Sequence, residues 1–274
     1  MKKVITYFSD LGGMPEPSSF LSDRAIFKEA YIFIPRGCIR DIVLSILPNW
    51  AKTRCWVLAK PLTGFIETFS YYLMEVSQGG GSVKPDPDQS VESILFVVEG
   101  ELELVVGGRK ENLSPGSYTY IPPGVNWSIN NDSSAPAKFH WIRKLYEKDS
   151  NLTIPDTFTV NEQSVTPKEM PNEPRWKTSR FVEPTDLRHD MHVNIVSFEP
   201  GSSIPFPETH VMEHAIYILQ GRGTYYLNGD WVDVEAGDFM ALRAFCPQAC
   251  QALGDEPFRY LLYKNVNRHI SLSS

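Results

Sequence analysis

Short apolar runs separated by turn residues occur along most of the chain. They are rich in Val, Ile, Tyr and Phe, and many are bounded by the chain's 18 glycines and 21 prolines. Runs of this length and composition predict short strands of an all-β sandwich or barrel, whereas long amphipathic helical patterns are scarce. The predicted strands include Ile94–Val98, Leu102–Val106, Tyr118–Ile121, Val193–Phe198, Ala215–Leu219, Thr224–Leu227 and Tyr260–Tyr263.

The pattern occurs twice. Gly221 lies 121 positions after Gly100, and Gly237 lies 121 positions after Gly116. At this offset residues 93–101 align with 214–222, and residues 113–128 align with 234–249, without a gap. Unrelated apolar strands would not keep both pairs of glycines in one frame, so the pattern indicates an internal duplication. We therefore predict two tandem β-barrels or jelly rolls.

The length of 274 residues and the apolar content of 42% are sufficient for two domains with cores of their own. The N-terminal domain is predicted to span residues 1–146, and the C-terminal domain residues 178–274. The segment between them, residues 147–177, is polar and proline-rich and is predicted to be the linker.

Charge and cysteine content restrict the partners and the compartment. The net charge is −7 and the pI is about 5.4, whereas nucleic acids and anionic membranes attract basic faces. We therefore expect neither as a partner, and we find no apolar segment of signal-peptide or membrane-spanning length. The four cysteines, Cys38, Cys55, Cys246 and Cys250, have no CxxC spacing. A disulfide framework is not expected, and the predicted location is the cytoplasm.

Three candidate metal ligands lie close together in the second copy. Glu208, His210 and His214 are separated by even numbers of residues, so on a strand they would point to one face. One carboxylate and two imidazoles suit a divalent ion such as Mn, Fe, Ni or Zn. The HxxxH spacing could also lie on a helix, but the apolar run that follows it and Gly221 favour strands. The alternative to a metal site is a set of unrelated surface or core histidines.

The first copy argues for the metal site. At the positions of Glu208, His210 and His214 it has Pro87, Gln89 and Ser93. The glycines of the scaffold are therefore shared, while the candidate ligands are confined to one copy. This is the pattern expected when one half of a duplicated fold keeps a site and the other half keeps only the barrel.

These motifs resemble those of the cupin superfamily, in its two-domain bicupin branch. The usual first motif, G-x5-H-x-H-x3,4-E-x6-G, corresponds here to Gly201-x6-Glu208-x-His210-x3-His214-x6-Gly221, with Glu and His exchanged at the outer positions and one residue added before the first ligand. The second motif, G-x5-P-x-G-x2-H-x3-N, has Trp127 in the histidine position of the first copy. In the second copy that position is Gln248. The resemblance thus implies two tandem cupin domains, with the ligands Glu208, His210, His214 and Gln248 only in the C-terminal one.

Residues 190–268 resemble the (S)-ureidoglycine aminohydrolase family more specifically. The exchanged Glu/His/His order occurs together with Pro247-Gln248 and with a YxxxK segment from Tyr260 to Lys264. The resemblance implies a hydrolase acting on a C–N bond, which converts (S)-ureidoglycine to (S)-ureidoglycolate and ammonia in purine and allantoin degradation. It further implies one Mn²⁺ per chain, with the substrate contacted by Glu208, Gln248, Tyr260 and Lys264.

Tyr260 and Lys264 are the candidate catalytic residues. They are four apart on a predicted strand and would share a face. We expect Lys264 to hold the substrate carboxylate or to transfer a proton, and Tyr260 to orient the substrate. Without the resemblance, Lys264 would be interpreted as a surface lysine at the end of a strand. Cys246 and Cys250 share the parity of Gln248 and are expected to be buried packing residues rather than ligands.

Two other functions fit the same residues. One is another metal-dependent cupin enzyme, either a dioxygenase or an isomerase, because two His and one carboxylate also suit iron. The other is a non-catalytic cupin that binds a small ligand. The expected partner is a small-molecule substrate, and a homo-oligomer is expected because exposed strand edges favour assembly.

Overall fold

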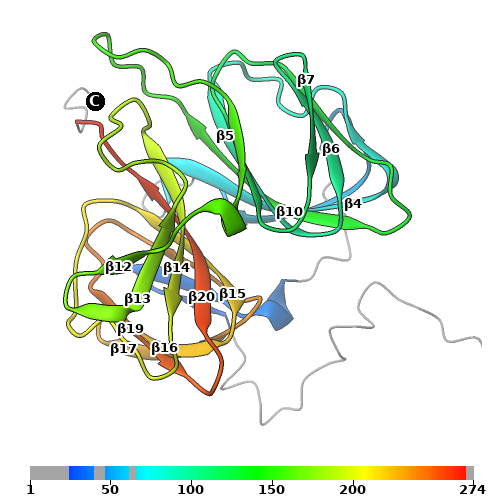
Figure 1. Ribbon diagram of the computed structural model, residues 1–274. Helices are drawn as coiled ribbons and strands as arrows, with labels where there is room; N and C mark the ends of the chain where they lie inside the picture. The colour runs from blue at the N-terminus through cyan, green and yellow to red at the C-terminus, as the bar shows by residue number, and fades with distance from the viewer. Residues whose placement is uncertain (1–24, 40–46, 62–65, 270–274) are drawn as a thin grey trace, which may run out of the picture.

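The computed structural model describes residues 25–39, 47–61 and 66–269. These residues form two β-barrels that lie side by side (Figure 1). The helical segments among them are two short 3-10 turns, η3 (Arg36–Cys38) and η4 (Glu162–Ser164). The predicted all-β fold with two cupin-like barrels is therefore confirmed.

The first barrel is one continuous sheet in the order β11-β8-β5-β10-β4-β9-β6-β7, with β3 paired to β4. Its β4 pairs with β10 along one part and turns to pair with β9 at Gly80–Ser82. Gly81, at φ +132°, permits this close approach, because a Cβ there would overlap the carbonyl oxygen of Ile129. The strands are β3 (Trp50–Ala59), β4 (Phe69–Ser82), β5 (Val91–Glu99), β6 (Leu102–Val106), β7 (Arg109–Leu113), β8 (Ser117–Ile121), β9 (Trp127–Asn131) and β10 (Ala137–Leu145).

The second barrel consists of two sheets that enclose a hydrophobic core. The larger sheet has the order β18-β15-β20-β14-β13-β12, and the smaller has the order β17-β16-β19. Every strand predicted from the sequence is found within one of the observed strands of the two barrels. The strands are β12 (Lys168–Met170), β13 (Glu173–Arg180), β14 (Met191–Phe198), β15 (His214–Gln220), β16 (Arg222–Leu227), β17 (Asp230–Glu235), β18 (Phe239–Leu242), β19 (Gln248–Leu253) and β20 (Phe258–Asn265).

Strands from both barrels cross the domain boundaries expected from the sequence. β1 (Ile26–Phe27) and β2 (Tyr31–Ile34) precede the first barrel in the chain, but β2 pairs with β18 of the second barrel. β11 (Phe158–Asn161) lies in the segment predicted to be a linker, and it pairs with β8 of the first barrel. Each barrel thus gains an edge strand from the segment that precedes the other barrel.

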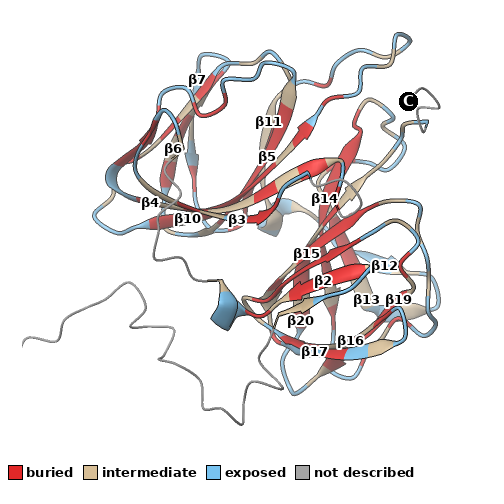
Figure 2. Cartoon of the chain, turned by 180° about the vertical axis from the view of Figure 1, so that it is seen from behind, coloured by how far each residue is buried: buried red, intermediate tan, exposed pale blue. Residues whose placement is uncertain are grey.

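The two barrels pack against each other through a third apolar core. On β20, Leu261 and Tyr263 face this interface, whereas Tyr260 and Leu262 face the interior of the second barrel. The interface is closed by aromatic contacts such as Phe69 against Tyr263, with ring centroids 4.0 Å apart. Figure 2 shows the buried residues along β14 and β15, which belong to the same sheet. One face of this sheet therefore supports the other barrel, and the opposite face lines a pocket.

Glu213 marks the edge of this interface. Its carboxylate accepts hydrogen bonds from the backbone N–H groups of Glu67 and Thr68, at 2.8 and 3.1 Å, and from the Thr68 hydroxyl. It points away from the pocket, as its parity predicts, but it binds the first barrel rather than solvent. Among the described residues, no helix is long and apolar enough to span a membrane.

Candidate active site

The six predicted site residues all line one pocket inside the second barrel, with a volume of about 140 Å³. They come from four places in the chain: the loop between β14 and β15, the first residue of β15, the first residue of β19, and β20. The six are Glu208, His210, His214, Gln248, Tyr260 and Lys264. Residues that are up to 56 positions apart in the sequence, from Glu208 to Lys264, are thus brought together by the barrel.

Glu208 and Gln248 are held opposite each other by the backbone. The N–H of each residue donates to the carbonyl of the other, and both distances are 2.9 Å. They form an isolated bridge, because the segment that carries Glu208 and His210 is otherwise irregular. The expectation that Glu208 and His210 lie on a regular strand is therefore wrong, although both side chains line the pocket.

His214 begins β15 and is buried. Its Nδ1 lies 3.0 Å from Nε2 of Gln248, while its own Nε2 is buried without a hydrogen-bond partner. Burial, together with the nearby His210 and Lys264, lowers the pKa of His214 to about 3. The imidazole is therefore neutral at physiological pH, so a ring nitrogen is available as a metal ligand.

The donor set fits a divalent cation. Nε2 of His210 lies 3.2 Å from Oε1 of Glu208, and the rings of His210 and His214 are 5.1 Å apart. The unpartnered Nε2 of His214 adds a buried atom that needs a ligand or a proton acceptor. In the part of the chain that the structure describes, however, no three His, Cys, Asp or Glu side chains form an assembled metal group. Metal binding by the four predicted ligands therefore stays a prediction.

Lys264 lies directly beside His214. It pairs with His214 on β15 and with His192 on β14, so the three residues form one row across the sheet. Burial lowers the pKa of Lys264, the positive charge of Arg180 lowers it further, and Glu208 opposes both effects. The ammonium makes no hydrogen bond or ion pair with the described residues, so its proton is held less tightly than that of a surface lysine.

Tyr260 lies two rows away on the same face of β20, as the spacing predicts. Its ring packs against Tyr225 with the centroids 5.9 Å apart, and Cys250 is within reach of its hydroxyl. Burial raises the pKa of Tyr260, so the phenol stays protonated and can donate a hydrogen bond into the pocket.

Comparison with known proteins decides the family. The sequence model of the Cupin domain family matches residues 72–143 and 194–263, which is once in each barrel. An (S)-ureidoglycine aminohydrolase from Arabidopsis thaliana is 32% identical over 90% of this chain and 79% of its own length. An (S)-ureidoglycine aminohydrolase from Escherichia coli K12 is 28% identical over 97% of this chain and 99% of its own length. The chain belongs to the bicupin family of (S)-ureidoglycine aminohydrolases.

A solved structure agrees with this family assignment. The crystal structure of a protein from Pseudomonas aeruginosa is 55% identical and has a TM-score of 0.89, and the match covers 96% of this chain and 97% of that one. This relative therefore shares the two-barrel fold described above over almost its whole length.

Arg180 and Asn194 are polar residues of the pocket that were not predicted. Arg180 at the end of β13 and Asn194 on β14 are cross-strand neighbours, and both line the pocket. Neither lies in a cupin motif, and β13 begins inside the segment predicted to be a linker. The internal repeat could have identified Arg180. At the offset of 121 residues, the equivalent residue of the first copy is Ala59 of β3, so the charged side chain occurs only in the second copy.

The remaining histidines and cysteines have simpler environments. His192, to which the sequence assigned no role, is buried beside Lys264, and burial holds its pKa at about 4. Cys246 and Cys250 are buried, and burial raises the pKa of Cys246 to about 11. Neither thiol lines the pocket, so the prediction that both are packing residues is confirmed.

Proposed function

We propose that this protein hydrolyses (S)-ureidoglycine to (S)-ureidoglycolate and ammonia. Family membership supports the reaction class, and the geometry supplies the groups that it needs. The observation that carries the proposal is the convergence of all four candidate ligands in one pocket with Lys264, whose pKa is lowered by burial.

We further propose one Mn²⁺ per chain, held by Glu208, His210, His214 and Gln248. A carboxylate, an amide oxygen and neutral imidazoles together suit an ion of intermediate hardness. When bound, such an ion supplies charge stabilisation and orients the substrate. The barrel holds the backbone of these ligands in place. An example is the β-bridge between Glu208 and Gln248.

Lys264 is proposed to move the proton. The reaction places a water oxygen on the carbon that loses ammonia, so a proton must leave the water and another must reach the departing amine. Burial lowers the pKa of Lys264, so its amine accepts and returns a proton more readily than that of a surface lysine. The protonated Tyr260 hydroxyl, on the same face of β20, donates a hydrogen bond that orients the substrate.

The deciding experiment generates ureidoglycine in situ from allantoate, a step that itself releases ammonia, and follows the additional ammonia that appears when this protein is present. We expect release that depends on the protein, stops after chelation of divalent ions, and returns with manganese. Release should continue without oxygen, which a dioxygenase would require. Binding of ureidoglycine without faster ammonia release would instead favour a non-catalytic cupin.

We also propose a cellular location, a pathway, an oligomeric state and a class of partner. The protein would act in the cytoplasm within purine and allantoin degradation, as a homo-oligomer, on a small-molecule substrate and without a nucleic-acid or membrane partner. The net charge of −7 supports the absence of polyanionic partners. Sedimentation of the purified protein would give the oligomeric state directly.

A further inference from the structure

Arg180 faces the interior of the second barrel. On β13, alternate residues line the pocket, namely Trp176, Thr178 and Arg180. Arg180 pairs with Asn194 on β14, and Asn194 in turn pairs with Leu262 on β20, next to the row of Lys264. Arg180 is therefore two strands and one row from Lys264, about 12 Å between Cα atoms at usual sheet spacings. Two side chains of this length can reach the same small molecule.

The guanidinium of Arg180 makes no hydrogen bond or ion pair with the residues that the structure describes. The charged side chains that line the pocket are Arg180, Lys264 and Glu208, and Glu208 lies against His210 at 3.2 Å. A lone, permanently charged fork inside a pocket is suited to bidentate binding of a carboxylate.

The first barrel contains an arginine that is paired with a carboxylate. There, Nε and Nη2 of Arg143 donate to the two carboxylate oxygens of Asp86 at 2.6 and 2.7 Å. Arg143 thus binds a carboxylate of the same chain with two hydrogen bonds, whereas no described carboxylate binds Arg180 in this way. The first barrel also has Ala59 where the second has Arg180, so an arginine at this position occurs only in the barrel with the candidate ligands.

From this arrangement we propose that Arg180 binds the carboxylate of the substrate and selects for ligands that carry one. The inference rests on the proposed function, since ureidoglycine has a carboxylate on the reacting carbon. It also separates two tasks that Lys264 could perform. Arg180 holds the carboxylate, and Lys264 remains available for proton transfer.

The test compares two stable ligands that share a ureido group. N-carbamoylglycine carries a carboxylate, and N-carbamoylglycinamide carries an uncharged amide instead. Binding of each to the full chain, supplied with manganese, is measured by calorimetry. We expect the native protein to bind the carboxylate at least about tenfold more tightly, as a charge-assisted hydrogen bond predicts. Arg180→Met should abolish this preference, and Arg180→Lys should retain part of it.

Two further variants identify the source of the preference. Arg175 lies on the same strand as Arg180 but does not line the pocket, and it is paired with Glu173, so Arg175→Met should keep the full preference. Lys264→Met should also keep it, because the proposal assigns the carboxylate to Arg180. Thermal unfolding of each variant checks that the barrel is intact.

The outcomes separate this inference from the proposed function. A folded Arg180→Met protein that keeps the native preference, or a Lys264→Met protein that loses it, overturns the role of Arg180. Native protein without any preference overturns it as well. A preference that depends on Arg180, in a protein that releases no ammonia from ureidoglycine, supports carboxylate binding by Arg180 and overturns the proposed hydrolysis.

Discussion

The two barrels share strand order and an offset of 121 residues, but their interiors are filled differently. In the second barrel, Gln248 and His214 border a pocket. In the first, the residue equivalent to Gln248 is Trp127, whose ring packs edge-to-face on Trp141 at 5.7 Å. The Nε1–H of Trp141 donates at 3.0 Å to the hydroxyl of Ser93, which occupies the position of His214. Indole rings therefore lie where the second barrel has candidate ligands, and Trp127 itself lines a pocket of the first barrel.

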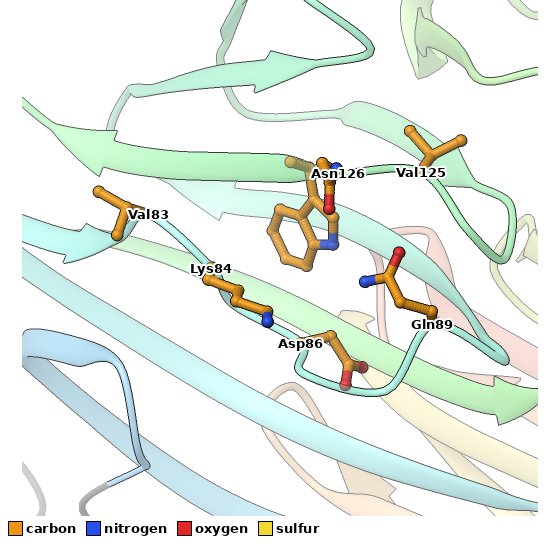
Figure 3. Close-up of a pocket in the computed structure, with 7 residues that line it drawn as sticks. Val83, Lys84, Asp86, Gln89, Val125 and Asn126 are labelled. Atoms are coloured by element: carbon orange, nitrogen blue, oxygen red, sulfur yellow. The ribbon is translucent and has the colours of Figure 1, made fainter.

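The charged residues differ in the same way. Arg143, equivalent to Lys264, is neutralised by Asp86 and lies over the ring of Trp141. A polar pocket of about 210 Å³ remains at the mouth of this barrel. Figure 3 shows Lys84, Asp86 and Gln89 along one of its walls, with Val125 and Asn126 across from them. At equivalent positions, the first barrel satisfies its polar groups internally and the second leaves them unsatisfied.

This contrast holds for the positions of His214 and Lys264. A buried polar atom without a partner costs stability. At these positions the first barrel has the paired Ser93 and Arg143, whereas among the described residues the second barrel has no partner for Nε2 of His214 or for the ammonium of Lys264. The contrast supports a ligand site in the second barrel, but the first barrel also has buried polar atoms without partners elsewhere, including both ring nitrogens of His140.

The largest effect is expected from His214→Ala. A bound metal supplies several kcal/mol of charge stabilisation, so ammonia release should fall about a thousandfold or more. Bound manganese, measured by atomic emission on desalted protein, should fall well below one ion per chain. The matched change in the first barrel, Ser93→Ala, should preserve both. Equal losses in the two variants would contradict the assignment of the site to one barrel.

Lys264→Met should separate chemistry from metal binding. If Lys264 transfers the proton, kcat should fall by about 10²–10⁴-fold, while the manganese content stays unchanged. Lys177→Met is the control, because Lys177 lies on β13 and is paired with Glu199 at the surface. Full turnover by the Lys264 variant with normal manganese would exclude proton transfer by this residue.

Arg143→Met makes the equivalent change in the first barrel and should affect stability instead. It leaves the carboxylate of Asp86 buried without its partner. We expect a loss of about 2–3 kcal/mol in the free energy of unfolding, less than for a fully buried pair, because the Arg143 side chain is 22% exposed. Urea denaturation measures the loss, and kcat should not change. A reduced kcat in the folded variant would mean that the first barrel takes part in catalysis.

A smaller effect is expected from His140 of the first barrel, which lines neither of the two pockets described above. It is buried between Tyr71 and Tyr217, and burial lowers its pKa from 6.5 to about 3. Between pH 6.5 and pH 3, His140 is therefore protonated in the unfolded chain but neutral in the folded chain. The stability present above pH 6.5 is lost as the pH falls toward 3, by about 2 kcal/mol between pH 6.5 and pH 5.

Urea denaturation at several pH values measures this slope, and His140→Phe should reduce it by the contribution of one proton. An unchanged slope in the variant would show that other groups, such as His192, account for the acid sensitivity.

The sequence predicted the architecture because the repeat is a long-range signal. The pairs Gly100/Gly221 and Gly116/Gly237 aligned two barrels before any strand pairing was known. The same frame, together with the resemblance to cupins, selected Gln248, which lies in the pocket beside His214.

The features that the sequence did not predict depend on contacts between distant segments. Nothing in Tyr31–Ile34 indicates that this strand pairs with β18, because edge pairing depends on three-dimensional proximity rather than on a local pattern. Arg180 was missed for a similar reason, since its strand was assigned in part to a linker. The contact of Glu213 with the first barrel is another example, because its partner Thr68 lies 145 residues earlier in the chain.

The exchange of β2 and β11 has a consequence for how the duplicated gene can change. If the chain were divided between its repeats, each fragment would lose the segment that covers an edge of its barrel, and both fragments would expose unpaired backbone groups to aggregation. Neither copy can be deleted or transferred to another protein alone without this cost. The first barrel therefore has a structural role, since it shares an apolar core with the second barrel and the two repeats pair segments across each other.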